Sequence, residues 1–100
     1  MITVHAKNFT LHSQDKEKIE HKAEKLLHLA RDMQDESTKI RVEFEIVAAK
    51  KDLIQGTLTI TLPGDVLRAE ATGEKNVLTI MDELEREIRP QIERHKAKRH

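Results

Sequence analysis

Basic side chains gather at two places in the sequence, and binding phosphate is the chemistry that they can perform. A helix is expected over residues 13–31, and successive residues of a helix are about 100° apart around its axis. The first basic group then shares one flank of this helix and consists of Lys18, His21, Lys22 and Lys25. Acidic residues of the same segment occupy the other flank. Ammonium groups along one edge are suited to phosphate oxygens, although charged flanks are also the usual state of a surface helix.

The second group lies near the C-terminus: Arg86, Arg89, Arg94, Lys96, Lys98 and Arg99. Basic residues at the end of a helix are favoured by its dipole, which explains part of this group but not all of it. Two adjacent basic edges would make one composite phosphate-binding surface. The candidate nucleic-acid-binding residues are Lys18, Lys22, Lys25, Arg86, Arg89, Arg94 and Lys96.

Residues that catalyse reactions or bind metals show no recognisable arrangement in this sequence. There is no cysteine, no glycine-rich phosphate loop, no H-E-x-x-H and no nucleophile elbow. The six histidines are scattered, and His21 and His28 lie two helical turns apart, too far for one metal ion by themselves. We therefore expect no enzyme activity, no cofactor, no metal and no small-molecule substrate.

Composition limits the kinds of partner. The formal net charge is zero, whereas a typical nucleic-acid binder carries a basic excess, so contacts with RNA require charge that is sorted in space. Phe9 and Phe44 are the only aromatic residues, which argues against a reader that stacks bases on aromatic side chains. No apolar run could span a membrane and no signal peptide is evident, so we expect a cytoplasmic protein.

The elements that must position these residues follow from hydrophobic periodicity in a chain of 100 residues, the size of one domain. Alternation predicts strands at residues 2–7, 40–46, 56–62 and 66–72, with Gly73 ending the last one. One helix is predicted from Ser13 to about Arg31 and another from Val77. Their apolar stripes are Ile19, Ala23, Leu26, Ala30 and Met33, and Val77, Ile80, Met81, Leu84, Ile88 and Ile92.

The resulting order, β-α-β-β-β-α, predicts an α+β fold with a four-stranded sheet. Because each strand has one apolar face, both helices should pack on the same face and leave the other exposed. Pro90 should kink or end the last helix near Arg89, with a kinked continuation favoured. We expect the domain to occupy residues 1–93 and a basic, mobile tail residues 94–100.

Nearly the whole chain resembles one family. The opening ITVHAKNFTL, the K-x-x-K-L pattern at Lys22, Lys25 and Leu26, and LRAEATGE at residues 67–74 are similar to those of short ribosome hibernation-promoting factors. These are also called ribosome-associated translation inhibitors, protein Y or sigma-54 modulation proteins. The resemblance implies a fold similar to double-stranded-RNA-binding domains with an added first strand. It also implies that the protein contacts ribosomal RNA in the decoding channel of the small subunit. Lys22, Lys25, Arg86 and Arg89 correspond to the basic residues that make these contacts in the family.

Two functions remain open from the sequence. The first is a hibernation or translation-inhibiting factor that binds the small ribosomal subunit through RNA phosphates. The alternative is a protein-interaction module of the same fold that has lost ribosome binding. It would use the exposed sheet face or an open strand edge for a protein partner or for self-association.

Overall fold

Six regular elements make up the computed structural model, which describes residues 1–31, 37–48, 50, 52–74 and 76–98. They are β1 (Ile2–Lys7), α1 (Ser13–Arg31), β2 (Lys39–Ala48), β3 (Leu53–Leu62), β4 (Asp65–Glu74) and α2 (Val77–Ala97). This order confirms the predicted β-α-β-β-β-α fold. The last three strands each extend beyond the residues predicted for them.

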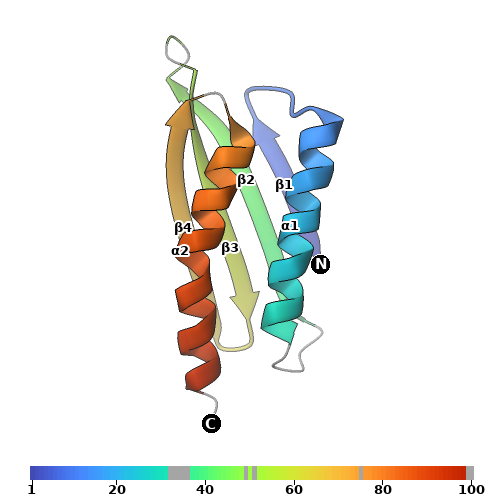
Figure 1. Ribbon diagram of the computed structural model, residues 1–100, viewed down its shortest axis with the longest axis vertical. Coiled ribbons are helices and arrows are strands. Elements are labelled where there is room, and N and C mark those ends of the chain that lie inside the picture. The colour runs from blue at the N-terminus through green and yellow to red at the C-terminus, as the bar shows by residue number, and fades with distance from the viewer. Residues whose placement is uncertain (32–36, 49, 51, 75, 99–100) are drawn as a thin grey trace.

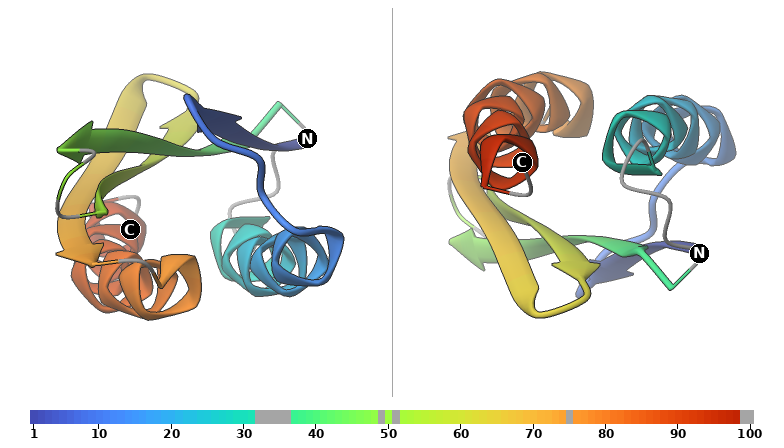
Figure 2. Two further views of the ribbon diagram at one scale, coloured as in Figure 1. Left: turned by 90° about the horizontal axis from the view of Figure 1, so that it is seen from above. Right: turned by 90° about the horizontal axis from the view of Figure 1, so that it is seen from below.

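The four strands form one sheet in the order β1-β2-β3-β4. β1 is parallel to β2, and the other neighbouring pairs are antiparallel. Inward-facing side chains lie in register across all four strands, as the row Val4, Val42, Leu58 and Ala69 shows. In Figure 1, α1 and α2 lie in front of the sheet, and Figure 2 shows both helices on the same side of it, as predicted.

The core lies between this sheet face and the two helices. The predicted stripe of α1 is buried at Ile19, Ala23, Leu26 and Ala30, and so is the whole predicted stripe of α2. Met33, the last member predicted for α1, lies outside the described residues. Burying an aliphatic side chain of this size stabilises a fold by about 1.5–3 kcal/mol, so these stripes hold the helices in place.

Ile80, near the start of α2, packs against two glycines of the sheet. A Cβ atom added at Gly56 in β3 would lie 2.5 Å from Ile80 Cγ2, and one added at Gly73 would lie 3.2 Å from Ile80 Cγ1. The expectation that Gly73 ends its strand is wrong, because it pairs with Ile54 inside β4. Its missing side chain lets the helix approach the strand closely.

Asn76 begins α2 as its N-cap. Its Oδ1 accepts hydrogen bonds from the backbone N–H groups of Leu78, at 3.0 Å, and Thr79, at 3.2 Å. These bonds satisfy two donors that the first turn of a helix leaves without an intrahelical partner.

Pro90 does not end α2, which continues to Ala97. The proline is exposed, so the carbonyl of Arg86 that loses its usual N–H donor can be solvated by water. The next turns are held by burial of Ile92 and His95. Residues 94–97, which the sequence predicted to form part of a tail, belong to the helix.

Two contacts fasten the second half of α2 to β4. The Gln91 amide donates through Nε2 to the Arg68 carbonyl, at 2.8 Å, and accepts through Oε1 from the Arg68 N–H, at 3.1 Å. One turn later, His95 Nδ1 lies 2.8 Å from Asp65 Oδ2. The C-terminal turns of the helix are thus fixed to the sheet by polar as well as apolar contacts.

Candidate nucleic-acid interface

The two helices lie side by side (Figures 1 and 2). The predicted basic flank of α1 faces α2, because Lys22 contacts Asp82. A shallow groove of about 310 Å³ lies along this flank. Its lining consists of Glu17, Lys18, His21, Lys22 and Lys25 from α1 and Leu78 from α2. Helical geometry therefore brings all three predicted lysines of α1 to one surface.

Lys22 lies at the junction between the helices. Its Nζ is 2.9 Å from Asp82 Oδ1 and 3.8 Å from Glu85 Oε1, both on α2. The hydrogen bond to Asp82, together with the negative charges of Glu85 and Asp82, raises the pKa of Lys22 against an opposing effect of desolvation. This ammonium group is therefore charged at neutral pH and already bound to carboxylates.

Arg89 joins the same surface from α2. Its guanidinium lies 4.0 Å from Glu85, the residue one helical turn earlier. Glu85 thus lies between Lys22 of α1 and Arg89 of α2. Leu78, Asp82, Glu85 and Arg89 follow each other at spacings of three and four residues, which defines the flank of α2 that faces α1.

The other predicted cations of α2 divide between different sides of the helix. Lys96, seven residues after Arg89, is on the flank that faces α1. Arg86 follows Glu85 directly and is turned about 100° away from it, but it is also one turn after Asp82, so it lies at the exposed edge of that flank. Arg94 is one turn after Gln91, whose side chain contacts β4, so it lies on that side. Helical geometry therefore places Arg89 and Lys96 on the flank that faces α1, Arg86 at the exposed edge of that flank, and Arg94 on the side of β4.

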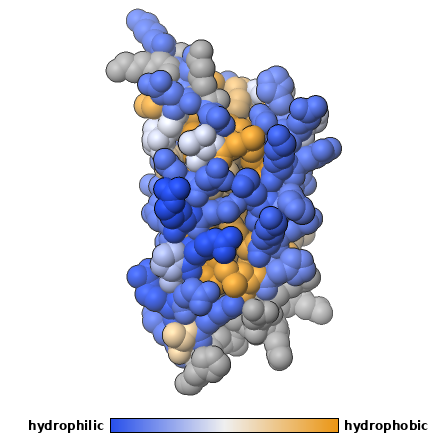
Figure 3. Space-filling model, in the orientation of Figure 1, coloured by the Kyte–Doolittle hydropathy of each residue, from blue (hydrophilic) through white to orange (hydrophobic). Residues whose placement is uncertain are grey.

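Lys18 and Lys25 are more accessible to a phosphate ligand than Lys22. Both are exposed, and within the described part of the chain neither forms an ion pair. Seen from the helical side (Figure 3), the surface is mostly hydrophilic, with hydrophobic patches showing between the helices. The groove thus combines long cationic side chains with the apolar side chain of Leu78.

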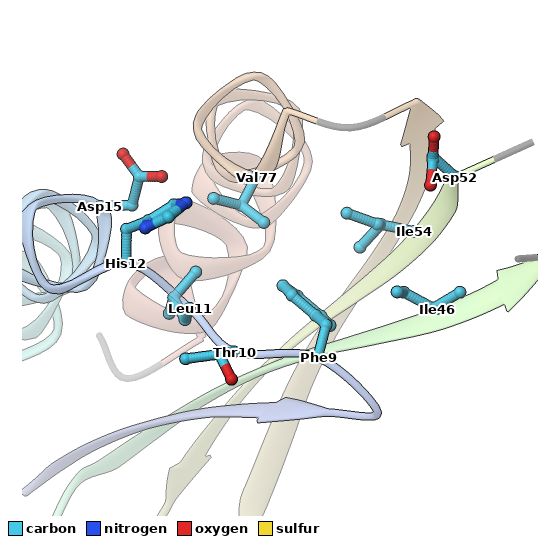
Figure 4. A pocket seen from close by; sticks show the side chains of 9 residues that line it. All are labelled: Phe9, Thr10, Leu11, His12, Asp15, Ile46, Asp52, Ile54 and Val77. Atoms are coloured by element: carbon cyan, nitrogen blue, oxygen red, sulfur yellow. The ribbon is translucent and has the colours of Figure 1, made fainter.

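A second hollow, of about 350 Å³, lies at the end of the molecule where both helices begin. Phe9, Leu11, Ile46, Ile54 and Val77 supply its apolar surface, and Thr10, His12, Asp15 and Asp52 supply its polar groups. Figure 4 shows Asp15 and Asp52 on opposite sides of it. Carboxylates on both sides make this hollow a poor site for phosphate.

The described residues contain no group of three or more His, Cys, Asp or Glu side chains placed to hold a metal ion. None of the described helices is long and apolar enough to cross a lipid bilayer.

Sequence reasoning missed two sets of residues. Asp82 and Glu85 were visible only as acidic residues upstream of the basic segment, and their contact with Lys22 depends on how the helices pack. His95 was assigned to the tail. Its signal was periodicity, because it follows Ile88 and Ile92 on the buried face at helical spacing.

Comparison with known proteins agrees with this architecture. The N-terminal domain of protein Y from Thermus thermophilus superimposes with a TM-score of 0.69 at 19% identity, covering 93% of this chain and 94% of that one. A ribosomal subunit interface protein from Coxiella burnetii superimposes with a TM-score of 0.74 at 23% identity, covering 96% and 97%. At these identities the likeness shows a common fold.

Curated protein sequences contain no significant match to the chain. The model of one protein family, in contrast, matches residues 2–100. Because this match spans nearly the whole sequence and agrees with the fold, the chain belongs to the sigma 54 modulation protein / S30EA ribosomal protein family.

Proposed function

We propose that this protein binds the small ribosomal subunit through phosphate groups of ribosomal RNA and silences the ribosome by occupying its decoding channel. The family is one of ribosome-associated modulation factors and not of enzymes. The observation that carries the proposal is the groove between α1 and α2, which gathers Lys18, Lys22 and Lys25 on one surface. A protein that acts on ribosomes in this way functions in the cytoplasm.

The mechanism requires occupancy and no chemical step. Cations held on two packed helices bind phosphates by charge, and each contact releases counterions from the RNA. The zero net charge of the chain does not oppose this, because three lysines and one carboxylate, that of Glu17, line the groove. Affinity should therefore fall steeply as salt concentration rises.

The direct test is co-sedimentation with purified ribosomes at a low and a high salt concentration. The wild-type protein should bind at low salt and dissociate at high salt. Lys18→Glu combined with Lys25→Glu should weaken binding at low salt and reduce its salt dependence, since both residues line the groove.

A matched control variant carries Lys16→Glu and Lys39→Glu. It has the same change in net charge, but both residues are exposed outside the groove lining. If both double variants bind equally well, the groove is not the RNA-binding surface.

One observation favours the alternative of a protein-interaction module. Asp82 and Glu85 place two carboxylates beside the basic flank of α1 and so reduce its positive potential. This alternative would be supported by two results together. The protein would form a salt-insensitive complex with another protein, and it would not sediment with ribosomes at low salt.

A further inference from the structure

We propose that Asp82 and Glu85 compete with phosphate for the cations of the groove and thereby limit its affinity for RNA, an inference that rests on the proposed function. A carboxylate offers anionic oxygens to an ammonium or guanidinium group much as a phosphate does. In this structure such oxygens already face the central cations of the groove.

Lys22 is the cation most affected. Its Nζ forms a 2.9 Å hydrogen-bonded ion pair with Asp82 Oδ1. An RNA phosphate can contact Lys22 fully only after this bond is broken or shared. The Asp82 side chain is 55% exposed, so it has room to move aside when a phosphate arrives.

Glu85 acts as a fixed countercharge between the helices. Its side chain is only 16% exposed, and its carboxylate lies 3.8 Å from Lys22 and 4.0 Å from Arg89. Its Oε1 has no hydrogen-bond partner among the described residues. This carboxylate therefore attracts both cations without saturating either, while Lys18 and Lys25 at the edge of the groove are not paired in the described residues.

Holding the helices together does not by itself explain the Lys22–Asp82 pair. α1 and α2 are already packed through buried residues of a common core, including Leu26, Met81 and Leu84. An exposed ion pair adds little stability to such packing. Its larger effect is on the charge that the groove presents to a ligand.

The experiment measures ribosome binding of Asp82→Asn over a series of salt concentrations. This variant keeps the shape of the side chain and releases Lys22, so binding at low salt should become about two- to fivefold tighter. The dependence of log affinity on log salt should steepen by about one phosphate contact.

Glu83→Gln is the matched control. It removes one negative charge from the neighbouring position of α2, at an exposed residue turned about 100° from Asp82. It should change affinity less and leave the salt dependence at the wild-type value. Equal effects of the two substitutions would overturn the inference, because net charge alone would then explain the gain.

Lys22→Met provides a second control. Without the ammonium group, Asp82→Asn should have no more effect than Glu83→Gln; a persisting gain would also overturn the inference. If the Lys18 and Lys25 double variant loses ribosome binding, the proposed function stands whether or not Asp82→Asn has the expected effect. If neither wild type nor Asp82→Asn binds ribosomes at low salt, the proposed function and this inference both fail.

Discussion

His95 and Asp65 are hydrogen-bonded across 30 positions of sequence, with 2.8 Å between Nδ1 of the imidazole and Oδ2 of the carboxylate. The imidazole is buried, whereas the carboxylate is 39% exposed. Asp65 also accepts a hydrogen bond from the backbone N–H of Val66. This pair ties the last turns of α2 to the first residue of β4.

Acid should weaken this connection. The pKa of Asp65 is lowered chiefly by the hydrogen bond from His95, next by the hydrogen bond from the Val66 N–H, and then by the positive charges of His95 and Lys98. A carboxyl whose pKa is lower in the folded than in the unfolded protein stabilises the fold fully above its unfolded pKa, about 4. That contribution is lost as the pH falls through the lower, folded value.

We therefore expect the wild-type protein to lose more stability than Asp65→Asn when the pH is lowered from 6 to 3. Urea unfolding at both pH values measures the difference. Equal losses in the two proteins would show that Asp65 does not contribute to acid sensitivity.

Gly56→Ala should destabilise the protein by about 1–3 kcal/mol, because the added methyl group would overlap Ile80 Cγ2 at 2.5 Å. In a domain of this size, each kcal/mol lowers the melting temperature by about 4–8 °C. Gly73→Ala is the graded control, since its closest contact with Ile80 is 3.2 Å. Thermal unfolding should show the larger decrease for Gly56→Ala; the reverse order would contradict this packing.

Lys22→Met should lower stability by only about 0.2–1 kcal/mol at neutral pH, the usual contribution of an exposed ion pair. The pKa of Lys22 is raised chiefly by its hydrogen bond to Asp82. Its contribution is therefore complete below the unfolded pKa of about 10.4 and lost as the pH rises through the folded value. Urea unfolding at pH 7 and pH 12 should show the difference between the two proteins disappear at high pH.

Among the cations of α2, Arg89→Ala should weaken ribosome binding more than Arg86→Ala, because Arg89 lies next to Glu85 on the flank that faces α1 and Arg86 lies at the exposed edge of that flank. Lys96→Ala should likewise weaken ribosome binding more than Arg94→Ala. Co-sedimentation of the four single variants at low salt measures the order. A greater loss from Arg86 and Arg94 would contradict an interface between the helices.

Local periodicity was sufficient to predict the elements of this fold. Alternation over residues 40–46 and the helical spacing from Ile19 to Ala30 depend only on which side of a strand or helix faces the core. The three candidate lysines of α1 were chosen in the same way, whereas the four candidates of α2 were chosen because basic residues cluster near the C-terminus. The basic flank of α1 could be recognised because it is a property of one helix.

Features that depend on contacts between elements could not be predicted in this way. Continuation of α2 past Pro90 was favoured by the apolar spacing of Ile92, but the contact of His95 with Asp65 that also supports it was not predicted. The ion pair of Lys22 with Asp82 depends on the position of α2 relative to α1. In each case the deciding residue lies far away in sequence, and its own local pattern does not identify its partner.

The contact of Gln91 with Arg68 also affects how the protein behaves at high concentration. β4 is an edge strand, and the unpaired backbone groups of such strands can pair with a strand of another molecule. Gln91 occupies both backbone groups of Arg68 near the middle of this edge. One amide side chain on the helix thus takes the place of a neighbouring strand at Arg68 and hinders strand pairing at that position.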